Sequence, residues 1–191
     1  MNINEYQNYH ETKAHTSAEF PYNTYLCSIP LDFPGVPLHW HDELELVVIK
    51  RGQGFVSVDF DKRLVHSGDI IIIPPRCLHA IEQDDTFKME YENIIFKPDL
   101  LSSGANDLCM IQYIVPLLDG SLPIEYFLTP ALGSFEALSN CIRQIDLVCA
   151  DQTPGWQLAV KVLCLTFSFL LISERQKKQS PLPPIPNLWR K

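Results

Sequence analysis

The sequence predicts a mainly β domain, a sandwich or barrel of short strands followed by α-helices. Between about residues 22 and 97, runs of β-favouring residues recur at roughly ten-residue spacing and are separated by turn signals. From about residue 98 onward, apolar residues recur at helical spacing instead. The chain has 191 residues and is 46% apolar, so it can bury a substantial core and is not expected to be disordered.

The strands are expected in the first part of the chain. Tyr22–Ile29 has the aromatic and β-favouring content of a strand, and residues 44–50 form a dense apolar run. Gly52-Gln53-Gly54 predicts a hairpin turn after that run, because glycine tolerates the positive φ that such turns need. Further strands are expected at residues 55–58, residues 64–66, Ile70–Ile73, His79–Gln83 and residues 87–96.

Helices are expected at residues 106–118, 134–150 and 153–179. Ser134 is the expected N-cap of the second helix, and Pro154 stands in the first turn of the third. Between residues 158 and 172 the third helix is apolar on nearly every side, so every side needs cover. A second copy of the chain is the expected partner, although the helices could instead cover one another. The expected homodimer interface contains Trp156, Val160, Leu163, Phe167 and Leu170.

Charge and hydropathy argue against several functions. The formal net charge is -8, which disfavours binding of nucleic acid by this chain alone. The N-terminus has no apolar signal region. The longest apolar run, residues 158–172, contains Lys161 and is shorter than the roughly 20 residues of a membrane span. No C-x-x-C pair occurs among the six cysteines, so reduced thiols in a cytoplasmic protein are expected.

The strongest candidate site combines two histidine segments. Side chains alternate along a strand, so His39, His41 and Glu45 would share one face unless a bulge intervenes. His79, on a second strand, could complete a set of three nitrogens and one oxygen for a divalent metal such as Zn, Ni, Mn or Fe. A polar pocket without a metal is the alternative. Trp40 alternates to the opposite face, where packing under a helix or loop is expected.

Two further residues are candidates for binding a ligand at this site. Arg76 precedes His79 and could pair with an anionic ligand, with a solvated loop arginine as the alternative. Tyr25 could line the pocket, with apolar core packing as its alternative.

The histidine segments resemble the two motifs of the cupin superfamily. Gly35, His39, His41, Glu45 and Gly52 match the first motif, and Gly68, Pro74 and His79 match the second. Arg76 stands where the second motif has glycine, and Gln83 stands where it has asparagine. The resemblance implies a cupin barrel, which is a double-stranded β-helix or jelly roll.

A narrower resemblance covers residues from about 20 to 178. The blocks LHWHDELELVVIKRG, GDIIIIPP, IIFKPDLL and QYIVPLL, followed by two helices, are similar to the N-terminal sensor half of AraC-type transcription regulators. That resemblance implies a small-molecule effector, of sugar or organic-acid type, bound in the barrel. It also implies contact with DNA only through a C-terminal helix-turn-helix domain, which is expected to be missing from this sequence.

These inferences together define four segments and three possible functions. The expected segments are an arm at 1–20, a cupin barrel at 21–98, a helical dimerisation region at 99–179 and a proline-rich linker at 180–191. His10 and His15, on the arm, are expected to be solvated. The expected function is effector sensing rather than catalysis. The alternatives are a metal-dependent cupin enzyme, of dioxygenase or isomerase type, and a dimerisation module that binds no ligand.

Overall fold

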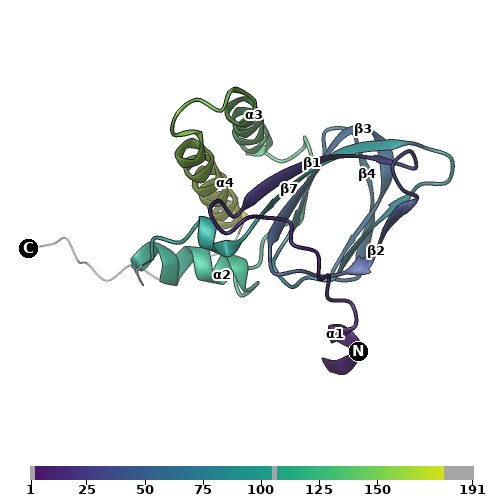
Figure 1. Ribbon diagram of the computed structural model, residues 1–191, viewed down its shortest axis with the longest axis horizontal. Helices are drawn as coiled ribbons and strands as arrows, with labels where there is room; N and C mark the ends of the chain where they lie inside the picture. The colour runs from purple at the N-terminus through teal and green to yellow at the C-terminus, as the bar shows by residue number, and fades with distance from the viewer. Residues whose placement is uncertain (1–2, 105–106, 179–191) are drawn as a thin grey trace, which may run out of the picture.

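A barrel of antiparallel strands with helices packed against its outside forms the structure, a computed structural model that describes residues 3–104 and 107–178 (Figure 1). The predicted class, a mainly β barrel followed by helices, is therefore confirmed. The linker expected at 180–191 lies outside the described residues. The strands are β1 Tyr22–Ile29, β2 Gly35–His39, β3 Leu44–Val58, β4 Asp61–His66, β5 Ile70–Ile73, β6 His79–Gln83, β7 Met89–Phe96 and β8 Phe127–Leu128.

Strand β3 joins two groups of strands. Its first half pairs with β7 and β5, and this group continues to β1 at one edge and β8 at the other. Its second half pairs with β4 and β6, and β6 continues to β2. The barrel expected at 21–98 thus gains β8 from beyond residue 98. The hairpin predicted at Gly52-Gln53-Gly54 is wrong, because β3 runs through this segment and passes from one group to the other.

The glycines bend β3 instead of reversing it. A register shift lies between Ile49 and Arg51, and Gly52 has a φ of 77°. A Cβ atom at Gly52 would lie 1.8 Å from the carbonyl oxygen of Lys88, the residue just before β7. Glycine is therefore required at position 52 both for the backbone conformation and for the close approach of the Lys88 backbone.

We expect Gly52→Ala to lower the free energy of unfolding by about 3–5 kcal/mol, because strain at positive φ adds to a backbone clash. Gly120→Ala is the matched control, since Gly120 has a φ of 75° but no heavy atom within 4 Å of the built Cβ. It should cost only about 1 kcal/mol. Chemical denaturation of both variants measures the difference, and equal losses would contradict this account of β3.

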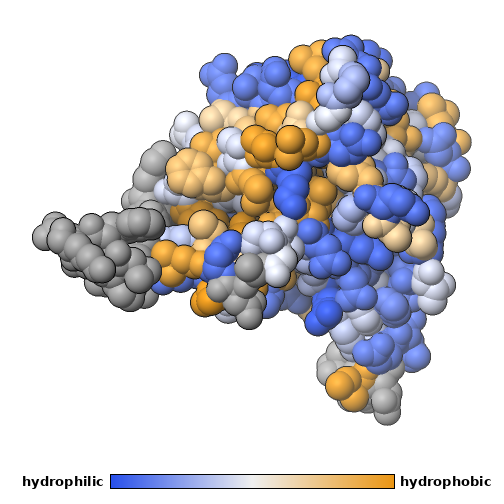
Figure 2. Space-filling view, turned by 60° about the vertical axis from the view of Figure 1, so that its left-hand side comes forward, coloured by the Kyte–Doolittle hydropathy of each residue, from blue (hydrophilic) through white to orange (hydrophobic). Residues whose placement is uncertain are grey.

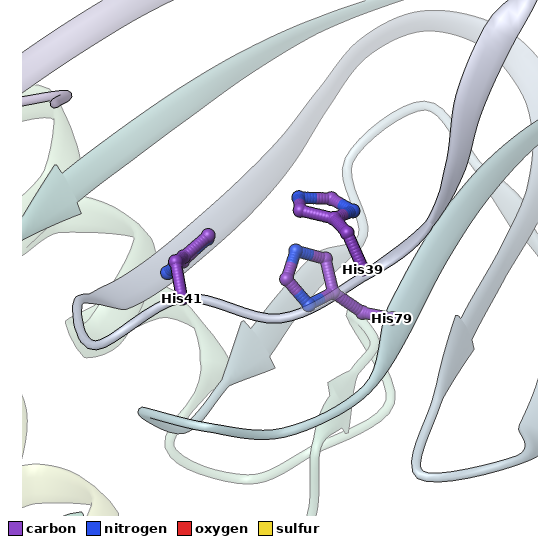
Figure 3. Close-up of side chains that lie close together, drawn as sticks. All are labelled: His39, His41 and His79. Atoms are coloured by element: carbon purple, nitrogen blue, oxygen red, sulfur yellow. The ribbon is translucent and has the colours of Figure 1, made fainter. Parts of the chain in front are cut away.

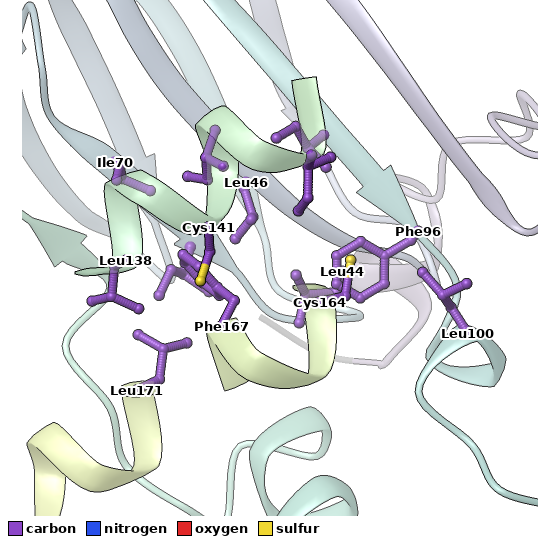
Figure 4. Packing of buried hydrophobic residues seen from close by; sticks show 14 of the residues in the cluster. Leu44, Leu46, Ile70, Phe96, Leu100, Leu138, Cys141, Cys164, Phe167 and Leu171 are labelled. Carbon is purple, nitrogen blue, oxygen red and sulfur yellow. The ribbon is translucent and has the colours of Figure 1, made fainter. Parts of the chain in front are cut away.

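Alternation along β3 serves two cores at once. Val47 and Ile49 point into the barrel with Ile71 and Ile73 of β5. Leu44, Leu46 and Val48 point outward and pack with helical residues (Figure 4). A strand buried on both faces is apolar at nearly every position, as residues 46–49 of β3 and the whole of β5 show. Each such side chain contributes roughly 1.5–3 kcal/mol on burial.

The helical region contains η1 Pro98–Leu100, η2 Met110–Ile114, α2 Val115–Leu118, α3 Phe135–Asp151 and α4 Trp156–Lys178. The helix expected at 106–118 is a π-helical turn, η2, followed by the short α2. Ser134 precedes α3 as predicted, but no capping hydrogen bond from its side chain is found in the described part of the chain.

Helix α4 has one buried face and one exposed face. Val160, Cys164, Phe167 and Leu171 are buried in the core that α4 shares with the barrel. The opposite side carries Leu158, Val162 and Phe169, which are 67%, 53% and 64% exposed. The prediction that Val160 and Phe167 belong to the dimer interface is therefore wrong, because both side chains pack against the barrel of their own chain. Trp156, Leu163 and Leu170 are half-buried.

Among the described residues, α4 contains the one helical stretch, Trp156–Arg175, whose length and apolar composition would allow it to cross a membrane. Its buried face packs into the core of this domain, and a core helix passes the same test. Packing therefore accounts for the apolar residues of the buried face, and the apolar residues of the opposite face remain exposed in this chain.

The described part of the N-terminal arm is docked on the barrel. It contains α1 Ile3–Gln7, which lies on the other side of the barrel from α3 and α4 (Figure 1). The Trp40 ring stacks on Tyr6 and on His10, with ring centroids 4.8 and 4.1 Å apart. The Trp40 indole donates a hydrogen bond to the carbonyl oxygen of Tyr6. His15 is buried rather than solvated.

Candidate functional site

Three histidines converge at one end of the barrel (Figure 3). His39 ends β2 and His79 begins β6, and the two residues are direct cross-strand partners. Their ring centroids lie 4.0 Å apart. The ring centroid of His41 lies 5.0 Å from that of His79, and one ring nitrogen from each of the three residues lies within 4.8 Å of the others. Cross-strand pairing therefore explains why two distant segments meet.

The histidines and Glu45 do not come from one uninterrupted strand. Strand β2 ends at His39, and His41 lies in the connection before β3. Glu45 is directed inward because it shares the inner face of β3 with Val47. Glu43, which belongs to the same alternating pattern, is also buried, with Oε2 3.6 Å from Nδ1 of His41.

Backbone carbonyls orient two of the imidazoles. Nδ1 of His39 lies 2.9 Å from the oxygen of Pro37, and Nδ1 of His79 lies 2.9 Å from the oxygen of Cys77. A carbonyl oxygen only accepts, so both Nδ1 atoms carry the proton. In the neutral ring, each Nε2 then presents a lone pair to the site. Fixing one ring nitrogen on a backbone oxygen is how proteins orient histidine ligands of metals.

Glu45 is an ionised carboxylate at the centre of the cluster. Its Oε2 accepts a hydrogen bond of 2.9 Å from Nε2 of His41 and lies 3.3 Å from Nε2 of His79. Burial would raise the pKa of Glu45, but its interactions with His41 and His79 outweigh burial and hold the pKa well below its usual range. A lone pair on His79 that faces this carboxylate is unfavourable unless a proton or a cation lies between them.

The donor set fits a divalent cation. Burial, followed by the neighbouring His79, lowers the pKa of His39, which keeps its Nε2 available as a ligand. Nδ1 of His41 has no hydrogen-bond partner within the described ranges, 3–104 and 107–178. Three imidazoles beside a carboxylate suit zinc, nickel, manganese or iron.

A cavity of about 470 Å³ opens beside these residues. It is within the size range of small-molecule sites. Tyr25 lines it, as expected for a ligand-binding residue, and so does Asn93 of β7, whose buried Oδ1 has no partner among the residues that the structure describes. The other polar residues that line it are Glu11, Lys13, His15, Asp32, His39, His41, Glu45, His79 and Tyr91.

Arg76 does not belong to the cavity lining. Its guanidinium is largely exposed, and its Nε donates a hydrogen bond of 2.9 Å to Asp42. Its backbone φ is 64°, the left-handed conformation that glycine adopts most easily, and the second cupin motif has glycine at this position. The prediction of a ligand-binding role for Arg76 is therefore not supported by its position.

Two residues of the arm, Glu11 and His15, lie beside the histidine cluster, and the sequence reasoning missed both. Oε2 of Glu11 lies 2.8 Å from Nε2 of His15 and 3.5 Å from Nε2 of His39. His15 packs edge-on against Tyr25 and lies beside His41. The hydrogen bond from His15 lowers the pKa of Glu11. No local sequence pattern marks these residues, because docking of the arm brings them to the cavity.

Comparison with known proteins identifies the family. A model of the AraC-like ligand binding domain matches residues 23–160. The chain belongs to the AraC-like ligand-binding domain family. The resemblance noted in the sequence is thus confirmed, and the AraC-like domain is a ligand-sensing regulatory domain.

Relatives of this AraC-like domain include two proteins of Bacillus subtilis. It is 32% identical over 169 residues to the uncharacterized HTH-type transcriptional regulator YdeC, covering 87% of this chain and 57% of that protein. It is 26% identical over 116 residues to a second such regulator, YbfI, covering 61% of this chain and 38% of that protein. The chain thus spans little more than half the length of the first relative.

A solved structure that is similar to this AraC-like domain is a cupin protein from Bacteroides fragilis. The two are 23% identical, with a TM-score of 0.38, over 47% of this chain and 74% of that chain. The likeness concerns the fold alone.

Proposed function

We propose that the barrel cavity binds a small-molecule effector, and that its occupancy controls a DNA-binding domain attached to this one. The observation that carries the proposal is a pair of buried polar atoms, Nδ1 of His15 and Oδ1 of Asn93, on residues that line the cavity and without hydrogen-bond partners among the described residues. Buried polar atoms without partners cost about 1–3 kcal/mol each, so a ligand that satisfies them gains affinity.

The polar groups favour hydroxyl-rich ligands. Neutral imidazole offers both a donor and an acceptor, and the amide of Asn93 offers both as well. The cavity is lined by three carboxylates, those of Glu11, Asp32 and Glu45. Among the described residues of the lining, Lys13 is the one lysine or arginine. A sugar therefore fits directly, whereas an organic acid needs a cation to offset this negative charge.

The histidine cluster would hold that cation. His39, His41 and His79, with Glu45, are the residues that would bind a divalent metal. Such an ion supplies a positive charge and a Lewis-acid position to which the oxygen of a ligand can bind. The same cluster is the observation that favours the second candidate function, a metal-dependent cupin enzyme. Stoichiometric metal in protein purified without added metal, together with oxygen consumption, would support that enzyme.

A homodimer through α4 is part of the proposal. Leu158, Val162 and Phe169 form an exposed apolar stripe on α4, and Figure 2 shows hydrophobic side chains gathered on the helical face of the domain. A cavity of about 540 Å³ adjoins this stripe and is lined by Phe169, Met110 and Ile114 among others. Soluble monomers seldom expose large continuous apolar patches. A dimer in the cytoplasm would place two attached DNA-binding units on paired half-sites.

Thermal-shift screening of sugars and organic acids tests effector binding. A ligand present at 100 times its Kd should stabilise the domain by about 2.7 kcal/mol, which is roughly 5–10 °C in Tm for a chain of this size. Asn93→Leu should abolish the shift, because it removes the unpaired amide and fills part of the cavity. Asn140→Leu, on the exposed side of α3, is the matched control. A ligand that stabilises both variants equally does not bind in this cavity.

A further inference from the structure

The N-terminal arm brings a carboxylate to the histidine cluster. The amide N–H of Glu11 donates to the carbonyl oxygen of Trp40 at 2.9 Å, and the amide N–H of Trp40 donates to the oxygen of Tyr9 at 2.9 Å. The side-chain amide of Asn23 donates to the oxygen of His15 at 2.9 Å. The arm is therefore tied to the barrel on both sides of Glu11, which holds the Glu11 side chain at the edge of the cavity.

Distances place Glu11 where a ligand of a common ion would lie. Ligand atoms bound at about 2.1 Å to one Zn²⁺ stand roughly 3.0 Å apart in octahedral geometry and 3.4 Å apart in tetrahedral geometry. Oε2 of Glu11 lies 3.5 Å from Nε2 of His39, and Oε2 of Glu45 lies 3.3 Å from Nε2 of His79. Each carboxylate oxygen thus lies at a similar distance from the Nε2 atom of one of the two imidazoles that backbone carbonyls orient.

Charge also favours a cation between Glu11 and His39. With Nδ1 of His39 bonded to Pro37, its Nε2 presents a lone pair toward a carboxylate oxygen. The same oxygen also accepts a hydrogen bond of 2.8 Å from Nε2 of His15, but the lone pair of His39 still faces it. This repulsion becomes an attraction when a cation lies between the oxygen and the nitrogen. Between the two tethers, Lys13 and Ala14 are exposed, so little apolar burial holds this part of the arm in place.

We propose that Glu11 is a metal ligand supplied by the arm, so that binding of a divalent ion by His39, His41 and His79 fastens the arm over the cavity. The inference rests on the metal site of the proposed function but not on the identity of the effector. Because the coupling is reciprocal, the factor by which Glu11 strengthens metal binding is also the factor by which the metal strengthens docking of the arm.

The test uses chelator-stripped protein, Zn²⁺ titration and trypsin cleavage after the exposed Lys13. Glu11→Gln should weaken Zn²⁺ binding by roughly 10–100-fold. Zn²⁺ should slow cleavage at Lys13 in the unchanged chain by a comparable factor and should leave cleavage of Glu11→Gln unaffected. The absorption spectrum of bound Co²⁺ should also change in Glu11→Gln, because a ligand is lost.

Glu19→Gln is the matched control, since it removes the same charge from an exposed position of the same segment. It should bind Zn²⁺ as the unchanged chain does. Equal Zn²⁺ affinity in Glu11→Gln, cleavage at Lys13 that Zn²⁺ does not slow, or no Zn²⁺ binding at all would each overturn the proposal. None of these results bears on effector binding as measured by the Asn93→Leu comparison, so the two proposals can fail separately.

Discussion

Phe167→Ala should lower the free energy of unfolding by about 3–5 kcal/mol, a large part of the stability of an ordinary domain. Phe167 is 4% exposed and packs in the core that joins α4 to β3 and α3 (Figure 4). Removing its ring would leave a cavity between the helices and the barrel, and the surrounding strands can collapse into it only partly. Chemical denaturation followed by circular dichroism measures the loss.

Phe169→Ala, two residues along the same helix, is the internal control. Phe169 is 64% exposed, so the truncation should change the unfolding free energy of a single chain by no more than about 0.5 kcal/mol. Dimerisation would add a contribution that depends on protein concentration, so both variants should be compared over a range of concentrations. Similar losses for Phe167→Ala and Phe169→Ala in dilute solution would show that α4 is rotated relative to the structure described above.

Phe169→Glu combined with Val162→Glu should convert a dimer into a folded monomer, with the mass in light scattering falling by half. Both residues belong to the exposed stripe of α4, and a buried, unpaired carboxylate in an interface is strongly unfavourable. The fold should survive, because neither side chain contributes to the core of its own chain. Circular dichroism should therefore remain unchanged while the mass falls.

Phe87→Glu is the matched control for the charge substitutions. Phe87 is 53% exposed in the connection between β6 and β7, away from the helices. Its substitution should leave the mass unchanged. A monomeric mass for the unaltered chain at micromolar concentration would contradict the proposed dimer, and so would loss of the dimer in Phe87→Glu alone.

The candidate site could be predicted largely because its residues follow local rules. Alternation along a strand is a local property, and it pointed to His39, His41 and Glu45 as one group, to which the second histidine motif added His79. The structure brings these four residues together, although the strand is interrupted between His39 and Glu45. Pairing of His39 with His79 across β2 and β6 compensates for that interruption.

Three features could not be read from local patterns. Gly52 and Gly54 carry the residue type of a hairpin, but pairing with β4, β6 and β7 keeps the chain extended through them. The buried face of α4 could not be predicted, because the helix is apolar on nearly every side and the position of the barrel decides which side is covered. The polar arm has no hydrophobic periodicity, and its position depends on the ring of Trp40, 30 residues beyond His10 in the sequence.

The amino-acid sequence by itself determined the class of the fold, the division into a strand-rich part followed by a helical part, the family and the histidine group. These depend on residue type, spacing and short-range geometry, which every part of the chain carries with it. Only the tertiary structure decided that β3 continues through its glycines without reversing, that Val160 and Phe167 face inward while Phe169 faces outward, and that Glu11 lies beside the histidines. Each of these depends on contacts between segments distant in the chain, whose energies outweigh local preference.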